Sequence, residues 1–167
     1  MANAPTEHHP VVGAIRRILD TAGISYQAFE HEPVRTSEEA AAVRPEYSLA
    51  QGAKALIVRI KKSGGERSFA QVVVPGDQKF DPKKLREVLG AKDVRFAYEG
   101  EVAELTGGVQ PGGVPPFGNI FGLTVIADQQ IFNNEDIIFN AGDRAVSIAM
   151  QSDDYRTIVK PHVADIV

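Results

Sequence analysis

The first clear pattern in the chain is a set of apolar residues that recur every three or four positions, which is the spacing of one helix face. Proline before the set and glycine after it are typical helix boundaries. The pattern therefore predicts an amphipathic helix that packs against the rest of the domain. The set lies between Pro10 and Gly23 and comprises Val11, Ala14, Ile15, Ile18, Leu19 and Ala22.

Capping residues, prolines and glycines at helix boundaries predict four further helices. Thr36 and Glu39 form a capping-box pattern before a run of alanines, and Asp81 stands before Pro82 as an N-cap followed by proline in the first turn. The predicted helices span 36–43, 82–89 and 99–105, and a last one follows Ser152-Asp153-Asp154.

Apolar segments bounded by turn signals predict strands elsewhere. The turn signal Lys62-Ser63-Gly64-Gly65-Glu66 separates two of them and indicates a hairpin. Strands and helices are interspersed, and the chain has no internal repeat. We therefore expect one mixed α/β domain over 10–167, with peripheral helices around a mixed or largely antiparallel sheet, preceded by a mobile tail over 1–9. The predicted strands span 24–31, 53–61, 67–75, 94–98, 123–127, 136–140 and 145–150.

Composition and charge exclude several classes of protein. The 18 Lys and Arg residues against 22 Asp and Glu give a formal charge of −4, so any nucleic-acid contact must come from a local basic patch. The absence of cysteine excludes disulfides, thiolate nucleophiles and cysteine-based metal sites. No apolar run approaches the roughly 20 residues of a membrane span, and the adjacent His8 and His9 lack further metal ligands. We expect a cytoplasmic protein that binds no metal, membrane or DNA.

The most unusual segment runs from Thr106 to Gly118 and contains five glycines and three prolines in 13 residues. This composition excludes a regular helix or strand. The segment is either a plain surface loop or a stiff loop whose backbone N–H groups approach a ligand. Its spacing matches neither a P-loop nor a dinucleotide-binding fingerprint.

Two side chains are candidates for chemistry on their own. Lys54 lies at the entrance of a predicted strand, where it is either a solvated end residue or a cation that binds a phosphate or polarises a carbonyl. His31 lies between two glutamates and is either a plain loop residue or a general base. The familiar hydrolase signatures G-x-S-x-G and H-E-x-x-H are absent.

Seven short segments, taken in order, resemble the YbaK/ProX family of aminoacyl-tRNA deacylases. These proteins are freestanding relatives of the editing domain of bacterial prolyl-tRNA synthetases. The resemblance extends from about residue 13 to residue 160. The segments are Phe29-Glu30-His31-Glu32-Pro33, Lys54-Ala55-Leu56-Ile57-Val58, Val74-Pro75-Gly76-Asp77, Asp81-Pro82-Lys83-Lys84-Leu85, Leu89-Gly90-Ala91-Lys92, Gly112-Gly113-Val114-Pro115-Pro116-Phe117-Gly118 and Phe139-Asn140-Ala141-Gly142.

The resemblance implies a curved, barrel-like mixed sheet with outer helices, and hydrolysis of the ester that joins a small, mischarged amino acid to tRNA. It assigns catalytic roles to Lys54, as the substrate anchor, and to Gly112 and Gly113, whose loop amides face the scissile carbonyl. A positioned water completes the reaction, without a cofactor. The implied partners are the acceptor end of an aminoacyl-tRNA and an aminoacyl-tRNA synthetase. The clusters Arg59, Lys61, Lys62 and Lys83, Lys84, Arg86 are the expected tRNA contacts.

The amino acid that is removed stays open, because three positions depart from the branches of the family. Phe29 replaces a tyrosine and Ser147 replaces an aspartate of the cysteine-specific branch, and Asn140 replaces a histidine of the alanine-specific branch. The predicted substrate-binding residues are these three together with His31 and Pro115. The alternatives are a binding module that serves as an adaptor for a synthetase and a hydrolase of free esters.

Overall fold

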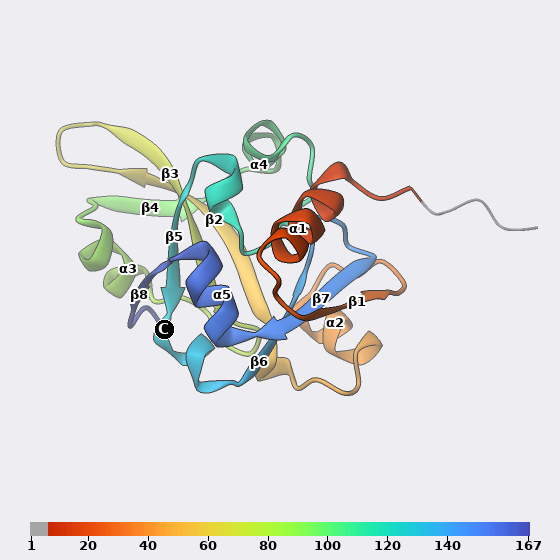
Figure 1. Cartoon of the computed structure of the whole chain (residues 1–167). Coiled ribbons are helices and arrows are strands. Elements are labelled where there is room, and N and C mark those ends of the chain that lie inside the picture. The colour runs from red at the N-terminus through yellow and green to blue at the C-terminus, as the bar shows by residue number, and fades with distance from the viewer. Residues whose placement is uncertain (1–6) are drawn as a thin grey trace, which may run out of the picture.

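The structure is a computed structural model that describes residues 7–167 (Figure 1). The amphipathic helix predicted at the start is confirmed as α1 (Pro10–Thr21), with Ile15 and Leu19 fully buried. The ring of His9 caps this helix, since its Nδ1 accepts a hydrogen bond of 3.1 Å from the Val11 N–H. Of the tail expected over 1–9, residues 1–6 lie outside the described residues.

The four other predicted helices are confirmed, and local capping explains most of their boundaries. Thr36 accepts from the Glu39 N–H as expected, but the Glu39 carboxylate accepts from the Arg35 N–H and so completes no capping box. Ser152 is the first residue of its helix and no cap, because its hydroxyl donates to the carbonyl of Asn134. The helices are α2 (Ser37–Val43), α3 (Pro82–Leu89), α4 (Glu99–Thr106) and α5 (Ser152–Val159).

The strands form two sheets. In the larger sheet, the predicted hairpin pairs β2 with β3 in antiparallel register, whereas β5 lies parallel to β3 and β8 parallel to β5. The smaller sheet is antiparallel throughout, in the order β1-β7-β6. The larger sheet has the order β4 (Asp93–Phe96), β2 (Ala53–Lys61), β3 (Arg67–Pro75), β5 (Thr124–Asp128) and β8 (His162–Ala164). The smaller sheet contains β1 (Tyr26–Glu30), β7 (Val146–Gln151) and β6 (Asp136–Asn140).

These two sheets do not close into one barrel. Among the described residues, an isolated bridge between Gly52 and Ile138 links the start of β2 to β6. The mixed α/β class predicted from the sequence is confirmed, but the single barrel-like sheet is not. Three short 3-10 turns complete the chain: η1 (Leu49–Gln51), η2 (Gly118–Phe121) and η3 (Gln129–Asn133). No helix in residues 7–167 has the length and apolar character needed to span a membrane.

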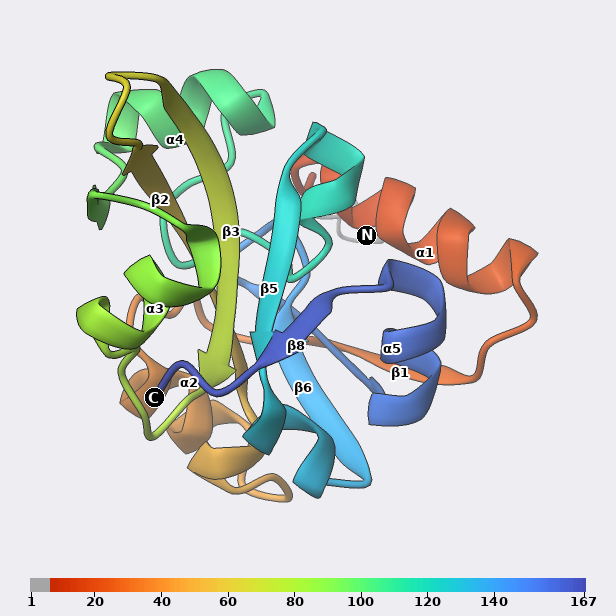
Figure 2. The same ribbon diagram turned by 90° about the vertical axis from the view of Figure 1, so that its left-hand side faces the viewer.

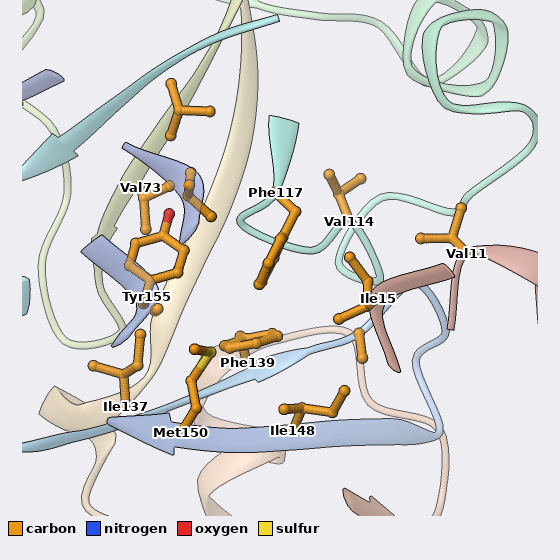
Figure 3. Packing of buried hydrophobic residues seen from close by; sticks show 14 of the residues in the cluster. Val11, Ile15, Val73, Val114, Phe117, Ile137, Phe139, Ile148, Met150 and Tyr155 are labelled. Atoms are coloured by element: carbon orange, nitrogen blue, oxygen red, sulfur yellow. The ribbon is translucent and has the colours of Figure 1, made fainter. Parts of the chain in front are cut away.

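The main core lies between the two sheets and includes part of the glycine- and proline-rich loop. Val114 and Phe117 of this loop are buried, and the Phe117 ring lies 5.6 Å from the ring of Phe139 and 5.8 Å from that of Tyr155. Burial of these side chains fixes the loop to both sheets and to α5. Figure 3 shows the loop residues above a floor formed by Phe139, Ile148 and Met150.

Candidate active site

A cavity of about 360 Å³ opens where α2, the start of β2 and the glycine- and proline-rich loop approach one another. In Figure 2, α2 lies at the opposite end of the molecule from the turn between β2 and β3. Three residues predicted from the sequence line this cavity together, namely Lys54 from β2, Gly112 from the loop and Asn140 from β6. Residues distant in sequence therefore meet at one site.

Lys54 is the second residue of β2, and its ammonium is half-buried at the cavity wall. Its Nζ donates a hydrogen bond of 2.8 Å to the carbonyl of Gln78, in the turn after β3. Burial lowers the pKa of Lys54 below its ordinary value, although the nearby Glu38 carboxylate opposes this shift. Lys54 is thus a cation at a fixed position, next to the cavity.

The glycine- and proline-rich loop is held in place through its carbonyl oxygens. Between Pro111 and Pro116, five residues have a carbonyl bonded to a group outside the loop, so this part of the backbone has little freedom to move. The bonds join Arg144 Nε to Pro111 at 2.8 Å, Asn140 Nδ2 to Gly112 at 2.5 Å, the Gly142 N–H to Gly113 at 2.8 Å, Gln71 Nε2 to Pro115 at 2.9 Å and the Tyr155 hydroxyl to Pro116 at 2.6 Å.

The N–H groups of the same loop divide into bonded and unbonded ones. The Gly113 N–H donates to the carbonyl of Gln110 at 2.9 Å, and Gly113 does not line the cavity. Gly112 and Val114 do line it, and no acceptor within residues 7–167 bonds to either N–H. Gly112 has a φ of +88°, and a Cβ there would lie 3.2 Å from the carbonyl oxygen of Arg35, so the position requires glycine.

Beside Asn140, a buried polar cluster surrounds Ser147, and the predicted neighbouring positions of these two residues on paired strands are confirmed. The Ser147 Oγ lies 2.6 Å from His31 Nε2, 3.0 Å from Arg44 Nη1 and 3.5 Å from Asn140 Oδ1. The His31 Nδ1 lies 2.8 Å from the carbonyl of Glu32. A carbonyl only accepts, so Nδ1 carries the proton and Nε2 accepts from the Ser147 hydroxyl.

Several predicted residues lie outside the cavity wall. His31 and Ser147 form the cluster beside the cavity, whereas the Phe29 ring packs edge-on against Tyr47 at 6.0 Å. Pro115 is buried and contributes the carbonyl that Gln71 holds. Among residues 7–167, no three His, Asp or Glu side chains gather in a way that could hold a metal ion.

Sequence reasoning missed Arg44, which ends α2 and lines the cavity. Its side chain is buried, at 8% exposure, and burial lowers the pKa of its guanidinium to about 10. The position resembles a plain helix end, because Pro45 follows it. Nothing local to that sequence signals burial, and the guanidinium meets Ser147, which lies on β7 and is distant in the sequence.

The cavity wall is predominantly cationic. Its charged residues are Arg35, Arg44, Lys54 and Lys79, against the single carboxylate of Glu38. A wall with this balance attracts anionic ligands although the whole chain carries −4.

Comparison with known proteins identifies the family of this chain. A model of the aminoacyl-tRNA editing domain matches residues 31–158. The multifunctional Ser/Thr-tRNA deacylase ProXp-y of Escherichia coli (strain K12) is 30% identical over 166 residues, which cover 99% of this chain and 95% of that protein. A proline–tRNA ligase of Stenotrophomonas maltophilia (strain R551-3) is 32% identical over 110 residues, which cover 66% of this chain and 19% of the ligase.

A solved structure described as a trans-editing enzyme for prolyl tRNA synthetase has the same fold. It superposes with a TM-score of 0.77 at 23% identity, and the match covers 96% of this chain and 98% of that one. The family model covers most of the chain, and the match to ProXp-y spans nearly all of both proteins. This chain therefore belongs to the family of aminoacyl-tRNA editing domains.

Proposed function

We propose that this protein is an aminoacyl-tRNA deacylase that hydrolyses, in trans, the ester of a tRNA carrying a small, incorrect amino acid. One observation carries the proposal: Lys54 and the unbonded N–H groups of a rigid loop line the same cationic cavity. An acylated ribose with its phosphate fits a wall of this charge. The names of the matched relatives support the same reaction.

In this proposal the loop amides stabilise the charge that develops during hydrolysis. A water oxygen attacks the ester carbonyl carbon, and the carbonyl oxygen becomes an oxyanion that accepts from the N–H groups of Gly112 and Val114. The bond from the carbonyl carbon to the ribose oxygen then breaks, and the ribose oxygen takes up a proton. An aminoacyl ester is already activated, so a positioned water and fixed donors suffice.

The two glycines of the loop have different roles in this scheme. Gly112 offers an N–H to the oxyanion, whereas Gly113 uses its N–H to close the turn with Gln110. Val114, which the resemblance did not assign, replaces Gly113 as the second donor. Lys54 binds the acceptor end, because its ammonium is fixed at 2.8 Å from the Gln78 carbonyl.

The length of the match suggests how the domain works with its partners. We propose that residues 10–167 form one domain, because the match to ProXp-y spans 99% of this chain and 95% of that protein. In this proposal the domain acts on aminoacyl-tRNA that a synthetase has released. His31 and Ser147 support the cavity from outside, and Asn140 contacts the substrate.

Replacement of Lys54 by alanine tests the proposal. Lys54→Ala is expected to lower kcat/KM for deacylation by about 100-fold or more, the loss typical for removal of a positioned polar group, without lowering the melting temperature. Lys92→Ala, at an exposed lysine outside the cavity wall and outside both basic clusters, is the matched control and should keep full activity. Unchanged activity in Lys54→Ala contradicts the proposal. If the protein binds mischarged tRNA but the ester is lost no faster than in buffer alone, the protein is instead an adaptor.

A further inference from the structure

Arg44 is a buried cation that lacks a carboxylate partner. No ion pair of the described residues includes it, and its Nε is buried without any acceptor. Of the five N–H groups of an arginine, only one, on Nη1, donates to a protein atom, the Ser147 Oγ. Such a group lowers stability unless something else satisfies it, so its presence in a cavity wall points to a ligand.

Contacts place Arg44 at the loop side of the cavity. Arg44 bonds to Ser147, Ser147 pairs with Asn140 across two strands, and the Asn140 amide holds the Gly112 carbonyl. Lys54 instead bonds to Gln78, in the turn after β3. If the Gly112 loop faces the ester, Arg44 lies beside the aminoacyl group, and Lys54 lies where the ribose and phosphate enter.

The polar atoms around Arg44 match one kind of side chain. Arg44 offers N–H donors, and the Oδ1 of Asn140 offers an acceptor. The Ser147 hydroxyl lies 3.5 Å from this oxygen, but it donates its hydrogen to His31 instead. A hydroxyl both accepts and donates, so it satisfies the two groups together. A methyl group satisfies neither, and a carboxylate only accepts and would face the Asn140 oxygen.

From this arrangement we infer that Arg44 and Asn140 form a subsite for the side-chain hydroxyl of the aminoacyl group, which selects serine and threonine over alanine and valine. The inference rests on the proposed function and adds the residues that read the amino acid. A site built to bond a hydroxyl strongly rejects an analogue without one, because its buried polar groups are then left unpaired.

Two pairs of substrates, in which one member carries the side-chain hydroxyl and the other lacks it, test the subsite. The same tRNA is charged with serine or alanine and with threonine or valine, and kcat/KM is measured for each. The expected preference of the unaltered protein is about 100-fold or more for the hydroxyl-bearing member of each pair. In Arg44→Met the preference should fall to within a few-fold, through slower hydrolysis of the serine and threonine esters and little change for the others.

Controls separate recognition from folding. Arg35→Met removes an exposed arginine of the same cavity wall and should leave the preference unchanged. Arg44→Lys keeps the charge but loses the planar guanidinium, so this variant should lose most of the preference for the hydroxyl. It replaces Arg44→Met as the test if Arg44→Met does not fold. Melting temperatures of all variants are recorded alongside. An unchanged preference in folded Arg44 variants overturns the inference. For the unaltered protein, equal hydrolysis of serine and alanine esters also overturns it, and so does faster hydrolysis of an aspartate ester than of a serine ester.

A binding measurement distinguishes failure of the subsite from failure of the proposed function. Stable amide analogues, 3′-seryl- and 3′-alanyl-amido adenosine, are titrated against the full chain. Tighter binding of the seryl analogue, lost in Arg44→Met, supports the subsite even if no ester is hydrolysed. Equal binding of the two analogues overturns the subsite and leaves the deacylase proposal to the Lys54 test.

Discussion

At the scale of single residues, burial changes the chemistry of the cavity lysine. Lys54 is a strand-end residue in the sequence, where solvation is the usual outcome. The cavity instead desolvates its ammonium, so its pKa lies below the ordinary 10.5. Its charged form is therefore disfavoured by folding, and the site keeps a cation at some cost in stability.

This shift gives a prediction for pH dependence. The ammonium is charged below its lowered pKa, so deacylation that needs the charge falls as pH rises through a value below 10.5. The measurement is kcat/KM from pH 7 to pH 10.5, after subtraction of spontaneous ester hydrolysis. Lys54→Arg should keep its activity to higher pH. Arg44 also titrates, at about 10, so a fall at the same pH in Lys54→Arg would assign the effect to Arg44 and contradict the prediction.

A glycine pair in the loop gives a second prediction. Gly112 and Gly108 both have positive φ, +88° and +94°, but only Gly112 lines the cavity. Alanine at either position costs about 1–2 kcal/mol of backbone strain. Gly112→Ala should in addition lower kcat at least about 10-fold by moving its N–H, whereas Gly108→Ala should change only the melting temperature. Equal kcat values in the two variants would remove Gly112 from the reaction.

At the scale of elements, β3 holds the loop through one buried side chain. Gln71 lies in the middle of β3, with its Nε2 donating to the Pro115 carbonyl and its Oε1 accepting from the Gly118 N–H at 2.8 Å. A strand with an otherwise apolar centre thus contains one amide that bonds both ends of a turn. Gly118 permits this approach, since a Cβ there would lie 2.9 Å from the glutamine side chain.

Gln71→Leu is therefore expected to weaken both the fold and the reaction. The substitution leaves a buried carbonyl and a buried N–H unpaired, and each unpaired group lowers the free energy of unfolding by about 1–3 kcal/mol. It also frees the loop, so kcat should fall by a larger factor than KM rises. Chemical denaturation and steady-state kinetics measure the two effects. Gln27→Leu, on exposed β1, is the control and should be neutral. A destabilised variant with normal kcat would show that loop rigidity is not required.

Local signals explain which elements the sequence predicts. Asp81 and Gly90 bound α3 as expected, because capping bonds join residues close in sequence. The strands of the β2–β3 hairpin are predicted to the residue, since a glycine turn sets their register. The division into two sheets and the three-residue β8 were not predicted, because they depend on contacts between segments far apart in the chain.

At the scale of the whole molecule, the candidate site was partly predictable. Lys54, Gly112 and Asn140 were found because their motifs resemble those of a family, and the structure brings them to one cavity. Arg44 and the N–H of Val114 were not found. Their significance depends on which groups are buried and which are left unbonded, and this is determined by contacts between segments that are far apart in the chain.

The surface charge of the molecule gives the last prediction, which concerns tRNA binding. Lys84 is held by Asp165 at 3.1 Å and by the Val167 carbonyl, so it ties down the C-terminal segment instead of facing a ligand. Lys62 in the hairpin turn and Lys83 on α3 are exposed. The turn between β2 and β3 and helix α3 lie on the side of the molecule opposite α1 (Figure 2).

Removing Lys62 and Lys83 together should weaken binding of all tRNAs alike and reduce the slope of log K against log salt by about 2, since each phosphate contact contributes close to 1. The control is the double change of Arg16 and Arg17 to alanine, two exposed positions on α1 that leave the same net charge. Fluorescence titration at several salt concentrations measures both. An equal loss in the two double variants would mean that only net charge matters, and no loss in either would place the tRNA on another face.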